Sequence, residues 1–296
     1  MTMGTGTIFV DSGLARRLEL AEAEGGASCG VALARERPES GACVVTIGGG
    51  RAVFTGVGSP ITQAIGVGLD GPVPAEDFAR LEDFFFSRGA AVNVETSPHA
   101  DASLFAQYAK NGYCATEFTS VLLRRVESGG GDDGETEIRQ SGDWRSQENP
   151  RSESAGVVIQ ELPVAEKDIW VRTVCEGFAE HYAVTDELME VMGLFGSSNG
   201  STLYLAKVAG AIAGGGALFV RDGVAGLFGA STLLEFRRRG VQRELIRVRM
   251  DGARRAGCEI ALTFARPGSI SERNLLRNGF AVGYTRTKFT RELVAK

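Results

Sequence analysis

The sequence predicts a mixed α/β protein built from two similar halves, and three observations carry this prediction. Strand-like and helix-like stretches alternate, with strand–helix–strand crossovers rather than an uninterrupted doubly wound repeat. A stretch rich in Gly, Ser and charged residues divides the 296-residue chain near its middle. The elements that end the first half also recur, in the same order, at the end of the second half.

Composition excludes several classes of protein. Hydrophobic residues make up 43% of the chain and charged residues 23%, as in ordinary globular proteins. The net charge of −5 argues against nonspecific nucleic-acid binding. The five scattered cysteines form no CxxC pair, so neither a disulfide framework nor a metal site is expected. No apolar stretch reaches the ~18 residues of a membrane span, and Met1–Val10 lacks a signal-peptide pattern. We therefore expect a cytoplasmic protein without a metal, nucleic-acid or membrane partner; its oligomeric state is not predicted.

The dividing stretch runs from Glu127 to Ala155. Ile138 and Trp144 are its only large apolar residues. Such a segment cannot bury enough apolar surface to offset the entropy lost on ordering, so it is interpreted as a flexible linker. The predicted domains are then residues 1–126 and 156–296.

Hydrophobic periodicity predicts the elements of the second half. The predicted strands are Val157–Leu162, Thr202–Val208, Ala211–Val220, Val224–Thr232, Glu259–Ala265 and Phe280–Leu293. The predicted helices are Ile169–His181, Asp186–Leu194, Val241–Arg255 and Ser271–Arg277. In the first half, the same reasoning predicts helices Ala79–Arg88 and Ala102–Lys110 and strands Ala91–Glu95 and Thr116–Arg124.

The ends of the two halves match with nearly constant spacing. Gly89 and Gly257 are 168 positions apart, and Tyr113 and Phe280, each following Asn-Gly, are 167 positions apart. Elements of the same type flank both pairs in the same order. This pattern indicates an internal duplication.

The segment Arg237–Gln242 has the features of an anion-binding loop. It lies between a predicted strand and the first turn of the long predicted helix, where backbone N–H groups and the helix dipole favour negative charge. Gly240 permits close approach of the backbone to a phosphate, and the arginines add fixed charge. From Arg237 to Arg255 there are eight arginines and only two acidic residues in a chain that is acidic overall.

This arrangement resembles the GNAT superfamily of N-acetyltransferases. Arg237, Gly240 and Gln242 fall on the family pattern Arg/Gln-x-x-Gly-x-Gly/Ala, and the order of elements and the Asn-Gly-Phe before the last strand also match. The resemblance implies two tandem GNAT-like domains, each with a mostly antiparallel central sheet and a splayed parallel strand pair flanked by helices. The first domain is interpreted as a degenerate copy without CoA, because the acidic segment Gly71–Phe78 stands where the loop should be.

The resemblance also implies a cosubstrate, acetyl-CoA, and the residues that would hold it. The diphosphate would be bound by Arg237, Arg238, Arg239, Gly240, Val241 and Gln242. Backbone groups of Ala230, Ser231 and Thr232 would meet the pantetheine and the thioester, and Ser271 and Asn274 would contact the pantetheine arm.

The sequence departs from the family where side-chain catalysts are usual. Leu275 stands where many members carry a tyrosine acid, Val224–Thr232 contains no acidic base, and Gln242 is larger than the usual Gly or Ala. His181 is a candidate base, with a polar helix-end residue as the alternative. Tyr284 is a candidate acid, with ring packing on a strand as the alternative.

The predicted function is that of an N-acetyltransferase. It would transfer an acetyl group from acetyl-CoA to a primary amine, either a small molecule or a peptide, by direct attack in a ternary complex. The alternatives are a non-catalytic acyl-CoA-binding or regulatory protein of the same fold, and an interaction scaffold that binds no CoA.

Overall fold

The computed structural model describes residues 8–127, 156–179 and 184–293, so the predicted linker lies outside it except for Glu127. The first-half elements are α1 (Ser12–Glu36), η1 (Pro38–Ser40), β1 (Cys43–Ile47), β2 (Gly50–Phe54), β3 (Gln63–Ile65), α2 (Ala75–Phe86), β4 (Val92–Thr96), α3 (Ala102–Asn111) and β5 (Cys114–Arg125). The second-half elements are β6 (Val157–Leu162), η2 (Val164–Glu166), α4 (Lys167–Phe178), α5 (Asp186–Ser197), β7 (Ser201–Val208), β8 (Ala211–Arg221), β9 (Val224–Thr232), η3 (Leu234–Phe236), α6 (Val241–Arg255), β10 (Ile260–Ala265), α7 (Ile270–Arg277) and β11 (Ala281–Arg291).

The predicted elements are confirmed in type and order. β6, β9 and α6 have the predicted bounds, and the ends of the other predicted elements differ by at most four residues, which is the usual uncertainty of element boundaries. The structure adds α1, β1, β2, β3 and the short 3-10 helices η1, η2 and η3, to which the sequence patterns assign nothing. The pattern is weak in α1 because Gly25, Gly26 and Gly30 lower the helix propensity of its second half.

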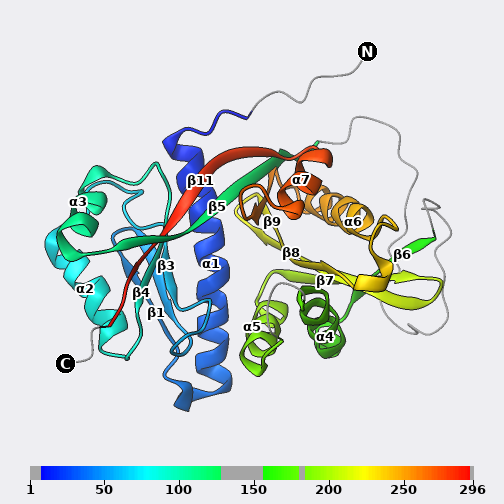
Figure 1. Cartoon of the computed structure of the whole chain (residues 1–296), viewed down its shortest axis with the longest axis horizontal. Helices are drawn as coiled ribbons and strands as arrows, with labels where there is room; N and C mark the ends of the chain where they lie inside the picture. The colour runs from blue at the N-terminus through cyan, green and yellow to red at the C-terminus, as the bar shows by residue number, and fades with distance from the viewer. Residues whose placement is uncertain (1–7, 128–155, 180–183, 294–296) are drawn as a thin grey trace.

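One sheet runs through both halves of the described chain (Figure 1). Its 11 strands follow the order β1-β2-β3-β4-β11-β5-β10-β9-β8-β7-β6. Most neighbours are antiparallel, and each half contributes one parallel pair, β3–β4 and β9–β10. This confirms the predicted mixed α/β fold and its two similar halves.

The helices cover the two faces of the sheet separately. Leu18 of α1 clusters with Val121 and Leu123 of β5, whereas Leu122 faces the other way and clusters with Leu245 of α6. Because successive side chains of a strand point to opposite faces, α1 and α6 must lie on opposite sides of the sheet. Further contacts place α4 and α5 on the face of α1, and α2, α3 and α7 on the face of α6.

The last strands of the two halves are exchanged. β11 lies between β4 and β5, with nine residues of β11 from Ala281 to Thr290 paired with β5. β5 in turn pairs with β10 over Ile260–Ala265. Each half therefore completes the sheet of the other, an arrangement that the sequence patterns do not predict. In Figure 1 the two strands run side by side across the middle of the molecule, with α1 crossing beneath them.

No helix in the described ranges is long and apolar enough to cross a membrane.

The exchange predicts that neither half folds to its native state alone. Without residues 156–296, β5 loses both neighbouring strands, and the fully buried Val121, Leu122 and Leu123 become exposed. We expect residues 1–140 and 141–296 to aggregate or to unfold without a cooperative transition when expressed separately, and to form a 1:1 complex when co-expressed. Calorimetry and sedimentation measure both outcomes. A cooperative, monomeric first half with native-like stability would contradict the prediction.

Candidate functional site

The parallel strands β9 and β10 separate part-way along their length. Their pairing covers only Val224–Gly226 of β9 and Ile260–Leu262 of β10, although both strands continue beyond it. At the point of separation the Thr263 hydroxyl donates a hydrogen bond to the Leu227 carbonyl at 2.9 Å. The two strands therefore form a V whose walls are backbone edges, in agreement with the splayed strand pair that the family resemblance implies.

A bulge distorts β9 inside this V. Ala217 and Gly215 of β8 pair with Phe228 and Ser231 of β9, so two β9 residues, Gly229 and Ala230, oppose a single β8 residue. Gly229 has φ +55°, and a Cβ atom there would lie 2.8 Å from the ring of Trp170. The bulge thus depends on a glycine and redirects backbone groups of β9 at this point.

The N-terminus of α6 stands just beyond the end of β9. Its N-cap residue, Gly240, has φ +83° and offers no side-chain cap to the first N–H groups of the helix. A helix start with free N–H groups and positive dipole charge fits a phosphate anion.

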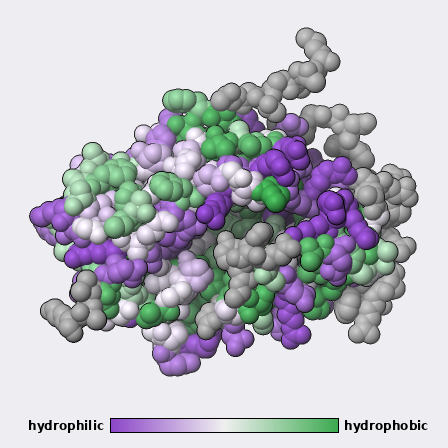
Figure 2. Space-filling view, in the orientation of Figure 1, coloured by the Kyte–Doolittle hydropathy of each residue, from purple (hydrophilic) through white to green (hydrophobic). Residues whose placement is uncertain are grey.

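The three loop arginines have different roles. Arg237 points back into the protein, where its Nε and a terminal nitrogen donate to the carbonyls of Thr232 and Gly177 at 3.4 Å. Arg238 (φ +64°) and Arg239 are exposed, and the Arg239 guanidinium lies 5.5 Å from the Phe236 ring centre. Arg237 therefore fastens β9 to α4, and Arg238 and Arg239 are the loop arginines that stay exposed. Figure 2 shows hydrophilic residues gathered over the region where Figure 1 places α6.

The remaining predicted residues lie close to this loop. The Asn274 amide of α7 donates to the Gln242 side chain of α6 at 2.9 Å, so the two helices meet beside the V. Ser271 is exposed in the first turn of α7. Ser231 is buried against α4, and Thr232 accepts from Arg237 through its carbonyl. His181 lies outside the described residues, so its role stays a prediction.

Arg249 is a functional candidate that the sequence patterns do not single out. It is 2% exposed, and one terminal nitrogen lies 3.4 Å from the carbonyls of Ala217 and Phe228, the pair of residues that adjoins the bulge on one side. No described carboxylate lies within ion-pairing distance of it, and burial lowers its pKa to about 10. It therefore remains cationic at neutral pH. Its only sequence signal is a charge at a buried position of the α6 periodicity.

Tyr284 is placed differently from a freely accessible acid. It lies on β11, separated from β10 by β5, and its hydroxyl donates to the carboxylate of Glu19 of α1 at 2.7 Å. Burial, followed by the charge of Glu19, raises the pKa of Tyr284 far above its ordinary value.

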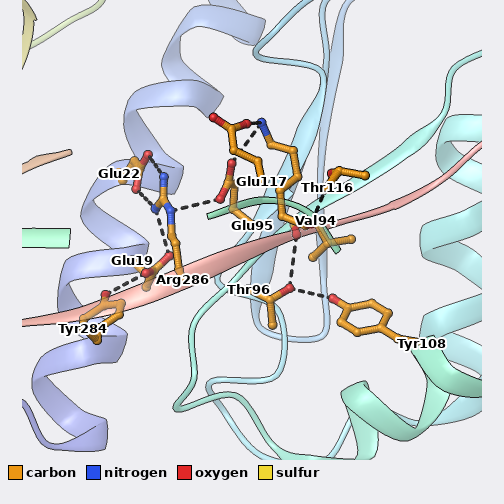
Figure 3. Close-up of polar contacts among 11 residues, drawn as sticks. Glu19, Glu22, Val94, Glu95, Thr96, Tyr108, Thr116, Glu117, Tyr284 and Arg286 are labelled. Carbon is orange, nitrogen blue, oxygen red and sulfur yellow. Dashed lines mark hydrogen bonds and ion pairs between the residues drawn. The ribbon is translucent and has the colours of Figure 1, made fainter. Parts of the chain in front are cut away.

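Tyr284 belongs to a buried acidic cluster that joins the two halves (Figure 3). Arg286 of β11 forms a bidentate ion pair with Glu22 and further ion pairs with Glu19 at 3.3 Å and Glu95 at 3.1 Å. The last contact leaves Glu95 Oε2 and Arg286 Nε without a hydrogen bond. Lys288 bridges Glu95 and Glu117.

Carboxylates outnumber cations in this cluster by four to two. Part of this excess of carboxylates over cations lies at Glu19, whose side chain is 1% exposed. Burial raises the pKa of Glu19 to about 7, with the Arg286 charge opposing the rise. The cluster therefore holds a carboxyl group that titrates near neutral pH.

The corresponding helix start in the first half is acidic. α2 begins after Pro74, which gives no side-chain cap, and its first turn carries Glu76 and Asp77. Their negative charges would repel a diphosphate.

Solved structures provide the comparison. Neither a protein-family model nor a curated protein matches the sequence. A GCN5-related N-acetyltransferase from Kribbella flavida is 15% identical with a TM-score of 0.59, covering 94% of this chain and 95% of that one. A tandem GNAT protein from the clavulanic acid biosynthesis pathway is 13% identical with a TM-score of 0.56, covering 96% and 95%. The chain has the tandem GNAT fold. A putative GNAT-family acetyltransferase from Novosphingobium aromaticivorans, 14% identical with a TM-score of 0.52, covers 95% of this chain and 99% of its own.

The tandem GNAT fold thus extends over nearly the whole chain, including the first half. At 13 to 15% identity the likeness establishes the architecture, whereas the chemistry depends on the residues of the site.

The raised pKa of Glu19 predicts a pH-dependent stability. Between about pH 4.5 and pH 7 the folded protein binds a proton at Glu19 that the unfolded chain has released, so the contribution of Glu19 to stability declines as the pH rises through this range. We expect the unfolding free energy of wild type, relative to Glu19→Gln, to fall by about 1 to 3 kcal/mol between pH 5 and pH 8. Urea unfolding at several pH values measures it.

Tyr284→Phe provides the matched control for this experiment. It removes the hydrogen bond that lowers the pKa of Glu19. The decline of the unfolding free energy with pH should therefore persist and extend to higher pH. If the unfolding free energies of wild type and Glu19→Gln changed with pH in parallel, the assignment of a raised pKa to Glu19 would be contradicted.

Proposed function

We propose that the chain is an acetyl-CoA-dependent N-acetyltransferase that acetylates a primary amine by direct attack in a ternary complex. The observation that carries the proposal is the continuity of β9, its bulge and the uncapped start of α6. An uncapped helix start and an opening between two strands thus lie next to each other on one short stretch of chain, which supports the proposal.

The loop would hold the diphosphate of the cosubstrate. The free N–H groups after Gly240, together with exposed Arg238 and Arg239, supply donors and positive charge. Asn274 and Gln242 would border the pantetheine arm where α6 and α7 meet. Arg237 would act indirectly, by fixing the end of β9 against α4.

The reaction requires few side chains. Acetyl-CoA supplies the acetyl group as a thioester. The neutral amine forms a C–N bond with the carbonyl carbon, and the C–S bond breaks. The nitrogen loses a proton and the departing sulfur gains one, so that CoA leaves as its free thiol. Backbone N–H groups at the Gly229–Ala230 bulge would donate to the carbonyl oxygen as negative charge develops on it.

Arg249 would assist this step electrostatically. Its buried charge lies behind the bulge, bonded to the carbonyls of Ala217 and Phe228. A fixed cation in a low-dielectric site stabilises developing negative charge more than an exposed one would. This offers compensation for the absent tyrosine at Leu275.

A non-catalytic acyl-CoA-binding protein is the second candidate. It is favoured by the absence of an acidic residue from β9 and by Leu275 at the usual position of the acid. Turnover distinguishes the two candidates. We expect the purified protein to release free thiol from acetyl-CoA only in the presence of a primary amine, with the N-acetylated product visible by mass spectrometry. Tight CoA binding without turnover of any amine in a broad panel would favour the second candidate.

The exposed loop arginines predict a defined loss of CoA affinity. Arg238→Ala with Arg239→Ala should weaken acetyl-CoA binding by roughly 5- to 20-fold, because two charges near the diphosphate are lost. The matched control, Arg254→Ala with Arg255→Ala, removes two exposed arginines from the opposite end of α6. It should change the Kd by less than about 2-fold. Calorimetric titration measures both, and equal effects would contradict the loop assignment.

A further inference from the structure

A cavity of about 200 Å³ lies where the two halves meet. The first half supplies small residues of α1 and apolar residues of β2 and β3, and the second half supplies α5, β8, β9 and β10. A water molecule needs roughly 10 to 15 Å³ of such space, so the cavity has room for an organic group of roughly ten heavy atoms.

The cavity opens onto the strands of the V. Leu227 and Phe228 of β9 and Leu262 and Phe264 of β10 line it. Ala261 and Ala265, whose side chains alternate with these on β10, contact the cluster beneath α6 and α7 instead. The cavity thus lies on the opposite face of the sheet from the α6 loop. A thioester inserted between the strands from the α6 side would present its carbonyl carbon to it.

Most of the lining is apolar. Phe195, Phe219, Phe228 and Phe264 surround the space together with aliphatic side chains. A polar ligand with many hydroxyl or ammonium groups would lose its hydration in such a site without gaining partners. The lining therefore favours an aromatic or branched apolar group.

The lining carries one acidic and one basic residue, Glu22 and Arg51. Arg51 is neutralised by Glu24 at 2.7 Å. Glu22 also lines the cavity, and its partner Arg286 stacks 4.4 Å from the ring centre of Phe264. Glu22 belongs to the buried cluster in which carboxylates exceed cations, so a single positive charge placed beside it would reduce the imbalance.

We propose that this cavity is the acceptor site, and that the acceptor is a primary amine joined to an aromatic or branched apolar group, with its nitrogen on the Glu22 side. The inference rests on the proposed acetyl transfer and deepens it by naming the class of amine. It excludes polyamines and amino sugars as good acceptors, because their several polar groups have no partners among the phenylalanines.

Gly26 permits a test that leaves the fold and the CoA loop intact. It lines the cavity from α1, and a Cβ atom there would meet no atom within 4 Å. Replacing a helical glycine also raises helix propensity. Gly26→Leu should therefore fill the cavity without destabilising the protein. Gly13→Leu makes the same change at an exposed position of the same helix and is the matched control.

The experiment measures binding and turnover separately, with 2-phenylethylamine and spermidine as probes. Wild type should acetylate 2-phenylethylamine with a kcat/KM at least 10-fold above that for spermidine. Gly26→Leu should lower kcat/KM and calorimetric affinity for 2-phenylethylamine at least 10-fold, with acetyl-CoA affinity and thermal stability preserved. Gly13→Leu should behave as wild type.

The other outcomes identify which idea fails. Amine binding that Gly26→Leu abolishes, without any turnover, supports the cavity and overturns the proposed transferase function. Turnover that prefers spermidine, or that Gly26→Leu leaves unchanged, overturns the cavity as acceptor site and retains the transferase. Failure of wild type to bind or acetylate 2-phenylethylamine overturns the inference.

Discussion

The antiparallel pairing of β5 with β11 is the interaction on which the rest of the structure depends. It joins the last strand of each half to the sheet of the other half, and the buried Val121–Leu123 segment packs against helices on both faces. Backbone groups in the middle of a sheet need neighbouring strands on both sides, so the exchange removes two sheet edges that separate halves would expose. It also fixes β10, and with it one wall of the V, from the first half of the chain.

The same pairing explains why charge is buried between the halves. Arg286 and Tyr284 lie on β11, Glu19 and Glu22 on α1, and Glu95 on β4, so the cluster exists only because β11 lies within the first half's sheet. A buried group of this kind contributes little net stability, since desolvation offsets much of the attraction. Its consequences are that burial raises the pKa of Glu19 to about 7 and that one carboxylate of the cluster, Glu22, lines the adjoining cavity.

The two halves divide the proposed work unequally. The second half retains an uncapped helix start, a bulged strand and a separated strand pair. The first half keeps the fold and replaces the loop with an acidic helix start. Its contribution is α1, whose small residues Ala21, Gly25 and Gly26 leave space against β9 and β10. Acceptor recognition would then lie with the half whose corresponding helix start is acidic.

The sequence by itself determined most of the local elements and the position of the arginine-rich loop before α6. Hydrophobic periodicity and turn residues predicted the type and order of the helices and strands from α2 onward. Gly240 before an arginine-rich helix predicted an anion-binding loop. Both kinds of signal are local in the chain. The patterns missed α1, whose glycines weaken its helical signal and which is held by packing on the sheet. Tertiary structure alone decided the strand exchange, the inward turn of Arg237, the burial of Arg249 beneath the bulge, and the meeting of Glu19 with Arg286. Each of these joins residues far apart in sequence, or depends on which way a side chain points, and neither periodicity nor motif spacing carries that information.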